Sequence, residues 1–241
     1  NMIKNLPWHT KLVLALVALL PVYFVIAALG TKFGIWDWQF GLAVMTFRGG
    51  MFLLGIVALA AVISLIMGVI AKPRHNSVLA VAIVGLLIPG AVFVMFTATR
   101  GTAAANPIHD VATDTADPPA FSSETLAARA TAGANPLNDY QVPLGQLDLY
   151  KDTKTENPEL AIKSHAQIIT TSYANLSPLP LAGASREDAI AAVAAGMGNM
   201  GFDNIRADAA TGMVEGVATS FWFGFKDDVV ARIGDNEINF R

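Results

Sequence analysis

Residues 49–71 read GGMFLLGIVALAAVISLIMGVIA, and this stretch contains no Lys, Arg, Asp or Glu. Two further runs without these four residue types occur at residues 12–31 and 76–99. A helix needs about 20 predominantly apolar residues to cross the hydrocarbon core of a bilayer. The sequence therefore predicts three transmembrane helices within the first hundred residues.

The charges divide the chain at the same place. Residues 1–100 carry seven Lys or Arg and one acidic residue, a net charge of +6, whereas residues 101–241 carry nine basic and eighteen acidic residues, a net charge of −9. An acidic region without a basic stripe argues against nucleic-acid binding, and anionic lipid headgroups repel it. We therefore expect a three-helix transmembrane anchor at residues 1–100 and a domain in water at residues 101–241.

Basic residues in short loops indicate which side of the membrane each loop occupies. With three spans, the N-terminus and the loop at residues 72–76 share one side, which carries four basic residues against three on the other. The short sequence Lys72-Pro73-Arg74-His75 strengthens this asymmetry. We expect the N-terminus inside the cell and the large domain outside the cytoplasm.

Two groups of residues in the anchor are candidates for binding partners. Ala60, Ser64 and Gly68 are spaced by four residues, and such a small-residue face lets another helix approach closely, either within the anchor or on a partner. Trp36 and Trp38 lie between the first two runs, where we favour anchoring at the lipid headgroups over stacking on a ligand. The runs hold no acidic residue, Lys or Arg, which argues against a transporter or pump.

The second part of the chain combines helical and strand patterns. A serine cap at residues 122–123 starts a helix to about residue 130, with Gly133 after its end. Pro158 precedes a helix to about residue 170, and Ser185 caps a third helix that ends near Gly201. Strands are expected at residues 212–223, 228–233 and 237–240, with turns at residues 224–227 and 234–236. Consecutive strands after a helix predict an α+β domain with an antiparallel sheet.

Two sequence blocks resemble the signatures of a family. Residues 108–121 read IHDVATDTADPPAF, and residues 215–232 read EGVATSFWFGFKDDVVAR. In this order and spacing they resemble the signatures of the domain-of-unknown-function family DUF1499, over about residues 106–241. The resemblance implies a bacterial protein with N-terminal membrane spans, although relatives also occur in chloroplasts. It implies no activity, because none is established for the family.

The chain departs from the family pattern in three places. Met200-Gly201-Phe202 stands where a Gly-Trp pair is common, and residues 141–159 resemble an insertion. The family usually continues into a Ser/Arg/Gly-rich segment and a final helix, so we expect the domain to be truncated at its C-terminus. With the charge asymmetry, the resemblance implies a multi-pass protein of the bacterial inner membrane whose C-terminal domain lies in the periplasm.

The first block contains the candidate metal ligands His109, Asp110, Asp114 and Asp117. Closely spaced carboxylates can bind a hard cation such as calcium, but the block lacks the ligand order and the glycine of an EF-hand. Asp, Thr and Pro also form ordinary turns and caps. We favour this structural interpretation and expect no cofactor.

The second block contains aromatic and charged residues together. Trp222 and Phe225 are either core residues, which we favour, or exposed anchors for a partner. Lys226, Asp227 and Asp228 could form a catalytic set, but adjacent residues of a strand face opposite sides, so a solvated turn is simpler.

Other catalytic patterns are missing from the sequence. It contains no cysteine, which excludes thiol catalysis and Cys-ligated metals. Ser164-His165 lacks the context of a catalytic triad and is expected on a helix surface. We therefore expect a non-enzymatic accessory or scaffold subunit of an integral membrane assembly, for example a respiratory or photosynthetic one, with the bilayer and other membrane subunits as partners. The alternative is an envelope enzyme, or a small-ligand or metal-binding protein, that uses the His109–Asp117 cluster.

Overall fold

The structure, a computed structural model, describes residues 5–241 and divides into two compact units. The first unit comprises the chain up to Ala105 together with the loop Ser220–Phe225. The second comprises Asn106–Thr219 and Lys226–Arg241. The boundary thus follows residue 105, and one loop of the C-terminal region belongs to the same unit as the anchor.

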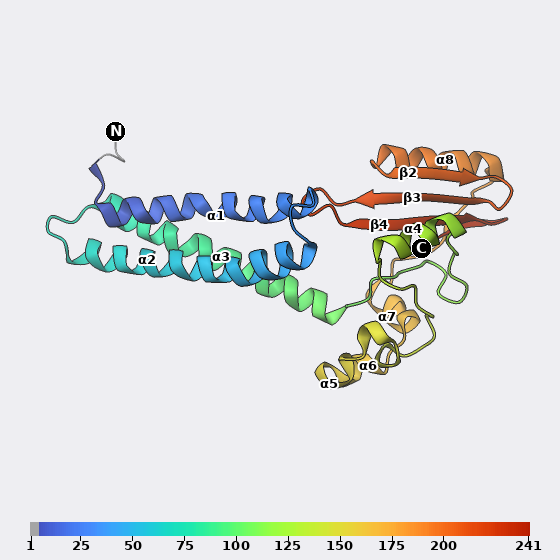
Figure 1. Ribbon diagram of the computed structural model, residues 1–241, viewed down its shortest axis with the longest axis horizontal. Helices are drawn as coiled ribbons and strands as arrows, with labels where there is room; N and C mark the ends of the chain where they lie inside the picture. Colours follow the sequence, from blue (N-terminus) through green and yellow to red (C-terminus); the bar gives the residue numbers. More distant parts are fainter. Residues whose placement is uncertain (1–4) are drawn as a thin grey trace. The chain divides into compact units, whose positions relative to one another are not determined.

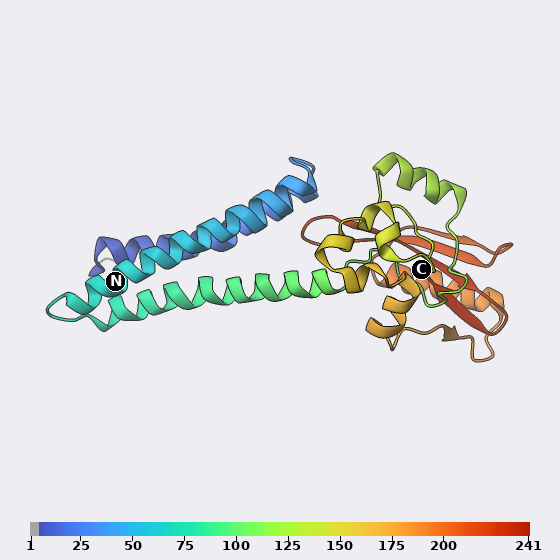
Figure 2. The same cartoon turned by 90° about the horizontal axis from the view of Figure 1, so that it is seen from below.

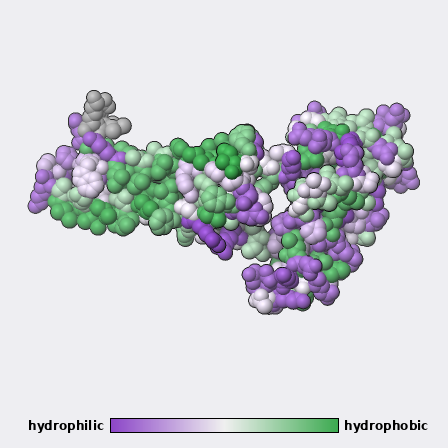
Figure 3. All heavy atoms as spheres, viewed as in Figure 1, coloured by the Kyte–Doolittle hydropathy of each residue, from purple (hydrophilic) through white to green (hydrophobic). Residues whose placement is uncertain are grey.

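Within residues 5–241, three helices are long and apolar enough to cross a membrane, and they contain nearly all of the three uncharged runs. Hydrophobic residues cover the middle of these helices on the face seen in Figure 3. Figure 2 shows α2 and α3 joined by a short loop at one end of the anchor. The helices are α1 (Trp8–Lys32), the π-helical η2 (Gln39–Gly49), α2 (Gly50–Ile70), which continues η2, and α3 (Asn76–Ala105).

The small residues of α2 lie at contacts between helices of the same chain. The buried Oγ of Ser64 lies 2.8 Å from Nδ1 of His9 on α1. A Cβ on Gly68 would lie 2.8 Å from Cγ1 of Val78 on α3. Ala60 is partly exposed. At Ser64 and Gly68, therefore, the small-residue face packs inside the anchor, the first of the two alternatives left open by the sequence.

The two tryptophans between α1 and η2 have different surroundings. Nε1 of Trp36 donates a hydrogen bond to the carbonyl oxygen of Ala27 at 3.2 Å, and its ring lies against Gly30, where a Cβ would clash with it. Trp38 is 52% exposed. Trp36 thus packs on α1, whereas about half of the Trp38 surface is exposed.

The second unit contains an antiparallel five-stranded sheet in the order β1-β5-β4-β3-β2. β3 and β4 form a regular hairpin from Met213↔Arg232 to Thr219↔Lys226. With the helices described below, this sheet confirms the predicted α+β class. The strands are β1 (Leu179–Pro180), β2 (Asp203–Asp208), β3 (Met213–Thr219), β4 (Lys226–Ile233) and β5 (Glu237–Phe240).

Helix α8 (Arg186–Asn199) packs on this sheet (Figure 1). Ser185 caps it, because its Oγ accepts a hydrogen bond from the backbone N–H of Asp188 at 3.1 Å. The buried side chains of Ile190 and Met197 share a core with residues of β3, β4 and β5. The cap matches the prediction.

A second core lies between the first signature block and several short helices. Its buried residues include Ile108, Tyr140, Leu144, Tyr150 and Ile168. The helices of this region are α4 (Ser123–Ala132), η3 (Leu144–Gln146), η4 (Asp148–Tyr150), α5 (Thr153–Glu156), α6 (Pro158–Ala161) and α7 (His165–Ser172).

Helix α4 follows the prediction at both ends. The side chain of Ser122 caps its first turn, and Gly133 ends it with a φ of 63°. The predicted continuous helix after Pro158 is wrong, because α6 ends at Ala161 and a new helix begins after Ser164. Ser164 and Gln167 form a reciprocal capping box, which satisfies the backbone of a fresh helix start.

The predicted strand at residues 212–223 is also too long. β3 ends at Thr219, and the turn covers residues 220–225 instead of 224–227, so Lys226 and Asp227 begin β4. β1 and β2 were not predicted from the sequence. β1 has two residues, and β2 is a largely exposed edge strand with an irregular register, so neither shows the alternation of a half-buried strand.

Candidate functional site

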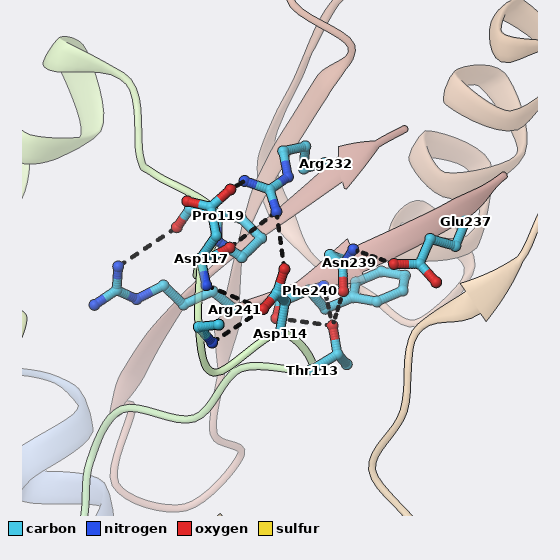
Figure 4. Close-up of polar contacts among 10 residues, drawn as sticks. Thr113, Asp114, Asp117, Pro119, Arg232, Glu237, Asn239, Phe240 and Arg241 are labelled. Carbon is cyan, nitrogen blue, oxygen red and sulfur yellow. Dashed lines mark hydrogen bonds and ion pairs between the residues drawn. The ribbon is translucent and has the colours of Figure 1, made fainter. Parts of the chain in front are cut away.

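Asp114 and Asp117 of the first signature block pair with one arginine of β4. Nη1 of Arg232 lies 2.8 Å from Oδ2 of Asp117, and Nη2 lies 3.4 Å from Oδ2 of Asp114 (Figure 4). Oδ1 of Asp114 also accepts hydrogen bonds from the backbone N–H groups of Ala116 and Asp117, each at 3.0 Å. Asp114 thus closes a turn of its own segment, as the favoured interpretation requires.

Thr113 connects the same segment to β5. Its backbone N–H donates to the carbonyl oxygen of Phe240 at 2.9 Å, and the backbone N–H of Phe240 donates to its Oγ1 at 2.9 Å. Its hydroxyl also donates to Oδ1 of Asn239 at 2.9 Å (Figure 4). The block is therefore held alongside the last strand.

Asp110 is buried in an ion pair with Arg241. Nη2 and Nε of Arg241 lie 2.6 and 3.0 Å from the carboxylate oxygens, and the hydroxyl of Tyr140 donates to Oδ1 at 2.5 Å. Burial raises the pKa of Asp110, but the hydrogen bonds from Arg241 and Tyr140 and the charge of Arg241 outweigh it and hold the pKa below its usual value. Burial and the bond to Asp110 raise the pKa of Tyr140. Asp110 is thus ionised and Tyr140 neutral near pH 7.

His165 lies beside this pair and is fully buried. Its ring stacks on Tyr140 and meets Tyr150 edge to face, with centroid separations of 5.5 Å in both cases. Within the described part of the chain, neither of its ring nitrogens has a hydrogen-bond partner. Burial lowers the pKa of His165, which favours the neutral ring. The prediction of a surface histidine was therefore wrong, because the face of α7 that carries His165 packs into the second core.

The four candidate metal ligands do not converge on one point. His109 is exposed and stacks on Tyr150 with a centroid separation of 6.3 Å, whereas the carboxylate of Asp110 lies inside the core. Across residues 5–241, no group of three or more His, Cys, Asp or Glu side chains has a geometry that could hold a metal ion. Arginines contact the carboxylates of Asp110, Asp114 and Asp117 instead.

The second signature block contributes a buried carboxylate that the sequence analysis missed. Glu215 accepts hydrogen bonds from the backbone N–H of Ser122 at 2.5 Å and from the hydroxyl of Thr125 at 2.6 Å, and it pairs with Arg206 at 3.0 Å. Burial raises the pKa of Glu215, but these hydrogen bonds lower it by a larger amount, so the pKa lies below its usual value. Its signal in the sequence was an acidic residue within an apolar strand.

Two of the hollows in the second unit are lined by residues outside the segment 109–117. One, of about 450 Å³, lies beside α4 and is bordered by Phe121, Arg206 and Glu215. The other, of about 410 Å³, is mainly apolar and lies between α8 and the sheet edge at Leu181 and Ile238.

The charged residues around the β3–β4 turn have different surroundings. Asp228 pairs with Arg129 of α4 at 2.5 Å, whereas Lys226 and Asp227 are exposed. Asp227 and Asp228 are neighbours on β4, and adjacent residues of a strand face opposite sides of the sheet.

The aromatic residues of the turn are exposed, which contradicts the favoured core interpretation. Trp222 is 52% and Phe225 37% exposed. The turn extends past the last paired residues of the hairpin, Thr219 and Lys226, and it lies outside the second unit. Its aromatic side chains are therefore not part of the core of that unit.

A comparison with family models agrees with this division of the chain. The model described as "Protein of unknown function (DUF1499)" matches residues 110–241, which is more than half of the chain. The chain belongs to the DUF1499 family. No curated protein and no solved structure is significantly similar to the chain. The DUF1499 match runs from Asp110 to Arg241, so the buried ion pair joins its first and last residues.

The polar groups of the DUF1499 region act as a fixed framework. Hydrogen bonds from Arg241 and Tyr140 hold the pKa of Asp110 below its usual value, and those from Thr125 and Ser122 do the same for Glu215. Arg232 pairs with Asp114 and Asp117. Through these contacts the carboxylates join segments that are far apart in the sequence.

Proposed function

We propose that this DUF1499 protein is a non-enzymatic accessory or scaffold subunit of an integral membrane assembly, for example a respiratory or photosynthetic complex. The observation that carries the proposal is the pairing of each carboxylate in the first signature block with an arginine of β4 or with Arg241. Because these carboxylates of the first signature block stabilise the fold, the domain serves as a rigid body for contacts.

The anchor supports this proposal through its outer surface. Its small residues and buried polar groups meet one another, so the three helices pack without a partner. The opposite side of α2 remains exposed and apolar along its whole length. Such a surface contacts lipid or the spans of neighbouring subunits. The exposed residues of this side are Phe52, Leu59, Ile63, Ile66 and Ile70.

The same proposal includes the location of the protein. The basic residues at the N-terminus and in the loop at residues 72–76 support a bacterial inner-membrane protein with its N-terminus in the cytoplasm. The acidic DUF1499 domain then lies in the periplasm. Its partners are the bilayer and other integral membrane subunits, and its negative charge argues against nucleic acid.

The alternative, an envelope enzyme or ligand-binding protein that uses the His109–Asp117 cluster, has weaker support. A binding site of that kind is a concave pocket with convergent polar groups. His109 and Asp110 have different surroundings, and neither residue lines either of the two hollows described above. The geometry therefore favours the scaffold.

Site-specific photo-cross-linking in native membranes tests the proposed function. A photoreactive amino acid replaces Leu59 on α2 or, in a second variant, Leu87 on α3, which are 61% and 65% exposed. We expect a discrete adduct with another membrane protein from at least one position. The same variants, purified and reconstituted alone, provide the control and should give only lipid adducts. Lipid adducts alone in native membranes, from both positions, would contradict an accessory subunit.

A further inference from the structure

The loop Ser220–Phe225 presents aromatic side chains to its surroundings. Phe221 is 71%, Trp222 52% and Phe225 37% exposed. Phe221 and Trp222 meet edge to face at 5.1 Å between ring centroids, and Phe223 stacks on Phe225 at 5.5 Å. The rings thus contact one another but keep much of their apolar surface open, which is unfavourable in water.

This loop belongs to the same compact unit as the transmembrane helices. Nζ of Lys32 donates a hydrogen bond to the carbonyl oxygen of Phe221 at 2.7 Å and lies 4.6 Å from the centroid of its ring. The ring of Phe225 meets that of Trp38 edge to face at 6.4 Å. Lys32 is the last residue of α1, so these contacts occur where the first apolar span ends.

The end of a membrane span has a characteristic chemistry. Tryptophan rings concentrate at the headgroup level, where an apolar body and a polar N–H are both accommodated. A lysine at a helix end extends its ammonium group toward water while its methylene chain remains in apolar surroundings. Lys32, Trp38 and the aromatic loop match this pattern at one end of α1.

We propose that the loop Ser220–Phe225 is a membrane-interface anchor, with the side chains of Phe221, Trp222 and Phe225 in the headgroup layer of the bilayer that the helices span. The loop then adds aromatic contacts with the lipid to those that the transmembrane helices make. This inference goes beyond the proposed function, because lipid alone satisfies the loop and no partner subunit is needed.

The chain contains no cysteine, so a single introduced cysteine can be spin-labelled specifically. Ser220→Cys places a nitroxide in the loop and leaves every aromatic residue unchanged, and Tyr173→Cys, at a residue 39% exposed beyond α7, is the matched control. The full chain is reconstituted in vesicles of phosphatidylcholine and phosphatidylglycerol. Accessibility of each label to oxygen, which concentrates in lipid, and to a water-soluble nickel chelate is then compared.

We expect the ratio of oxygen to nickel accessibility to be severalfold higher at residue 220 than at residue 173. A ratio equal to that of the control would overturn the proposal, because the loop would then lie in water. Protection of the label from both reagents would also overturn it, because the loop would then be packed against protein.

A second variant tests whether the aromatic residues themselves hold the loop in lipid. Phe221→Asp in the Ser220→Cys background introduces a charge that the interface disfavours, and the exposure of Phe221 leaves the fold intact. We expect the accessibility ratio to fall to the level of the control, whereas Phe221→Leu should keep it high. An unchanged ratio in Phe221→Asp would refute an aromatic anchor.

Discussion

Arg241 contacts Asp110 through two hydrogen bonds, although 131 positions separate them in the sequence. The pair is almost completely buried, with 10% and 7% of the two side chains exposed. The hydroxyl of Tyr140 donates a third hydrogen bond to Asp110. The guanidinium carbon of Arg241 also lies over the ring of Tyr140, 5.2 Å from the ring centroid. The pair thus fixes the end of β5 to the start of the DUF1499 region.

Removal of Arg241 should destabilise the domain strongly. Arg241→Ala leaves the buried carboxylate of Asp110 without its cation, and breaking a buried pair in this way costs about 3–5 kcal/mol. Arg232→Ala, which breaks a more exposed pair, should cost no more than about 1 kcal/mol. Urea unfolding followed by circular dichroism measures both. Equal losses in the two variants would contradict a special contribution from the buried pair.

The buried His165 predicts a loss of stability in acid. Its pKa is lowered in the folded state from the usual 6.5, so below that pH the unfolded chain binds more protons than the folded one. Stability should therefore fall as the pH drops below about 6.5 and level off beneath the folded pKa. His165→Phe keeps an aromatic ring without unpaired nitrogens, and its melting temperature should vary less between pH 7 and pH 5. A parallel pH profile in both proteins would refute this role.

Asp110 should also make the folded domain less stable in acid, at a lower pH than His165 does. Its pKa lies below the usual 3.8 in the folded state, so its contribution is complete above that value and is lost as the pH falls through the folded pKa. Asp110→Asn should remove this acid-dependent loss and lower the stability at pH 7. Melting temperatures measured from pH 5 to pH 2 provide the comparison.

Chelators should leave the domain unchanged. Asp114 and Asp117 already pair with Arg232, so the double variant Asp114→Asn/Asp117→Asn should lose only about 1 kcal/mol. Thermal unfolding of the full chain with and without EDTA, and then with calcium, measures the effect. A melting temperature that falls with EDTA and returns with calcium would show that a metal stabilises the folded state.

Gly68→Leu should disturb the anchor itself. Its side chain would overlap Val78 and Leu79 of α3, and such overpacking costs about 1–3 kcal/mol. Gly55→Leu on the same helix is the matched control, because a Cβ there meets no atom within 4 Å. Thermal stability in detergent should fall only for Gly68→Leu. If both variants are equally stable, the small-residue face does not pack inside the anchor.

The proposed orientation predicts the activity of reporters. Alkaline phosphatase fused after Gly133, which ends α4, should be active, since the enzyme folds only outside the cytoplasm of a bacterium. A fusion at Arg74, between α2 and α3, should be inactive. The reverse pattern would invert the assigned topology.

The sequence by itself determined the local features of this protein. Uncharged runs longer than a bilayer requires predicted three long apolar helices, and serine caps placed the starts of α4 and α8 correctly. The two signature blocks predicted the family match, and strand patterns predicted the β3–β4–β5 meander. Each of these signals lies within some twenty neighbouring residues, where backbone geometry and hydropathy act directly.

Only the tertiary structure decided which faces are covered and which charges meet. His165 was expected on a surface and is buried, whereas Trp222 was expected in a core and is exposed. Asp110 was a candidate metal ligand with a favoured structural interpretation, and the structure shows its carboxylate paired with Arg241. Burial and ion pairing depend on packing between residues that are distant in the chain. The local sequence of a segment does not show which distant residues will contact it.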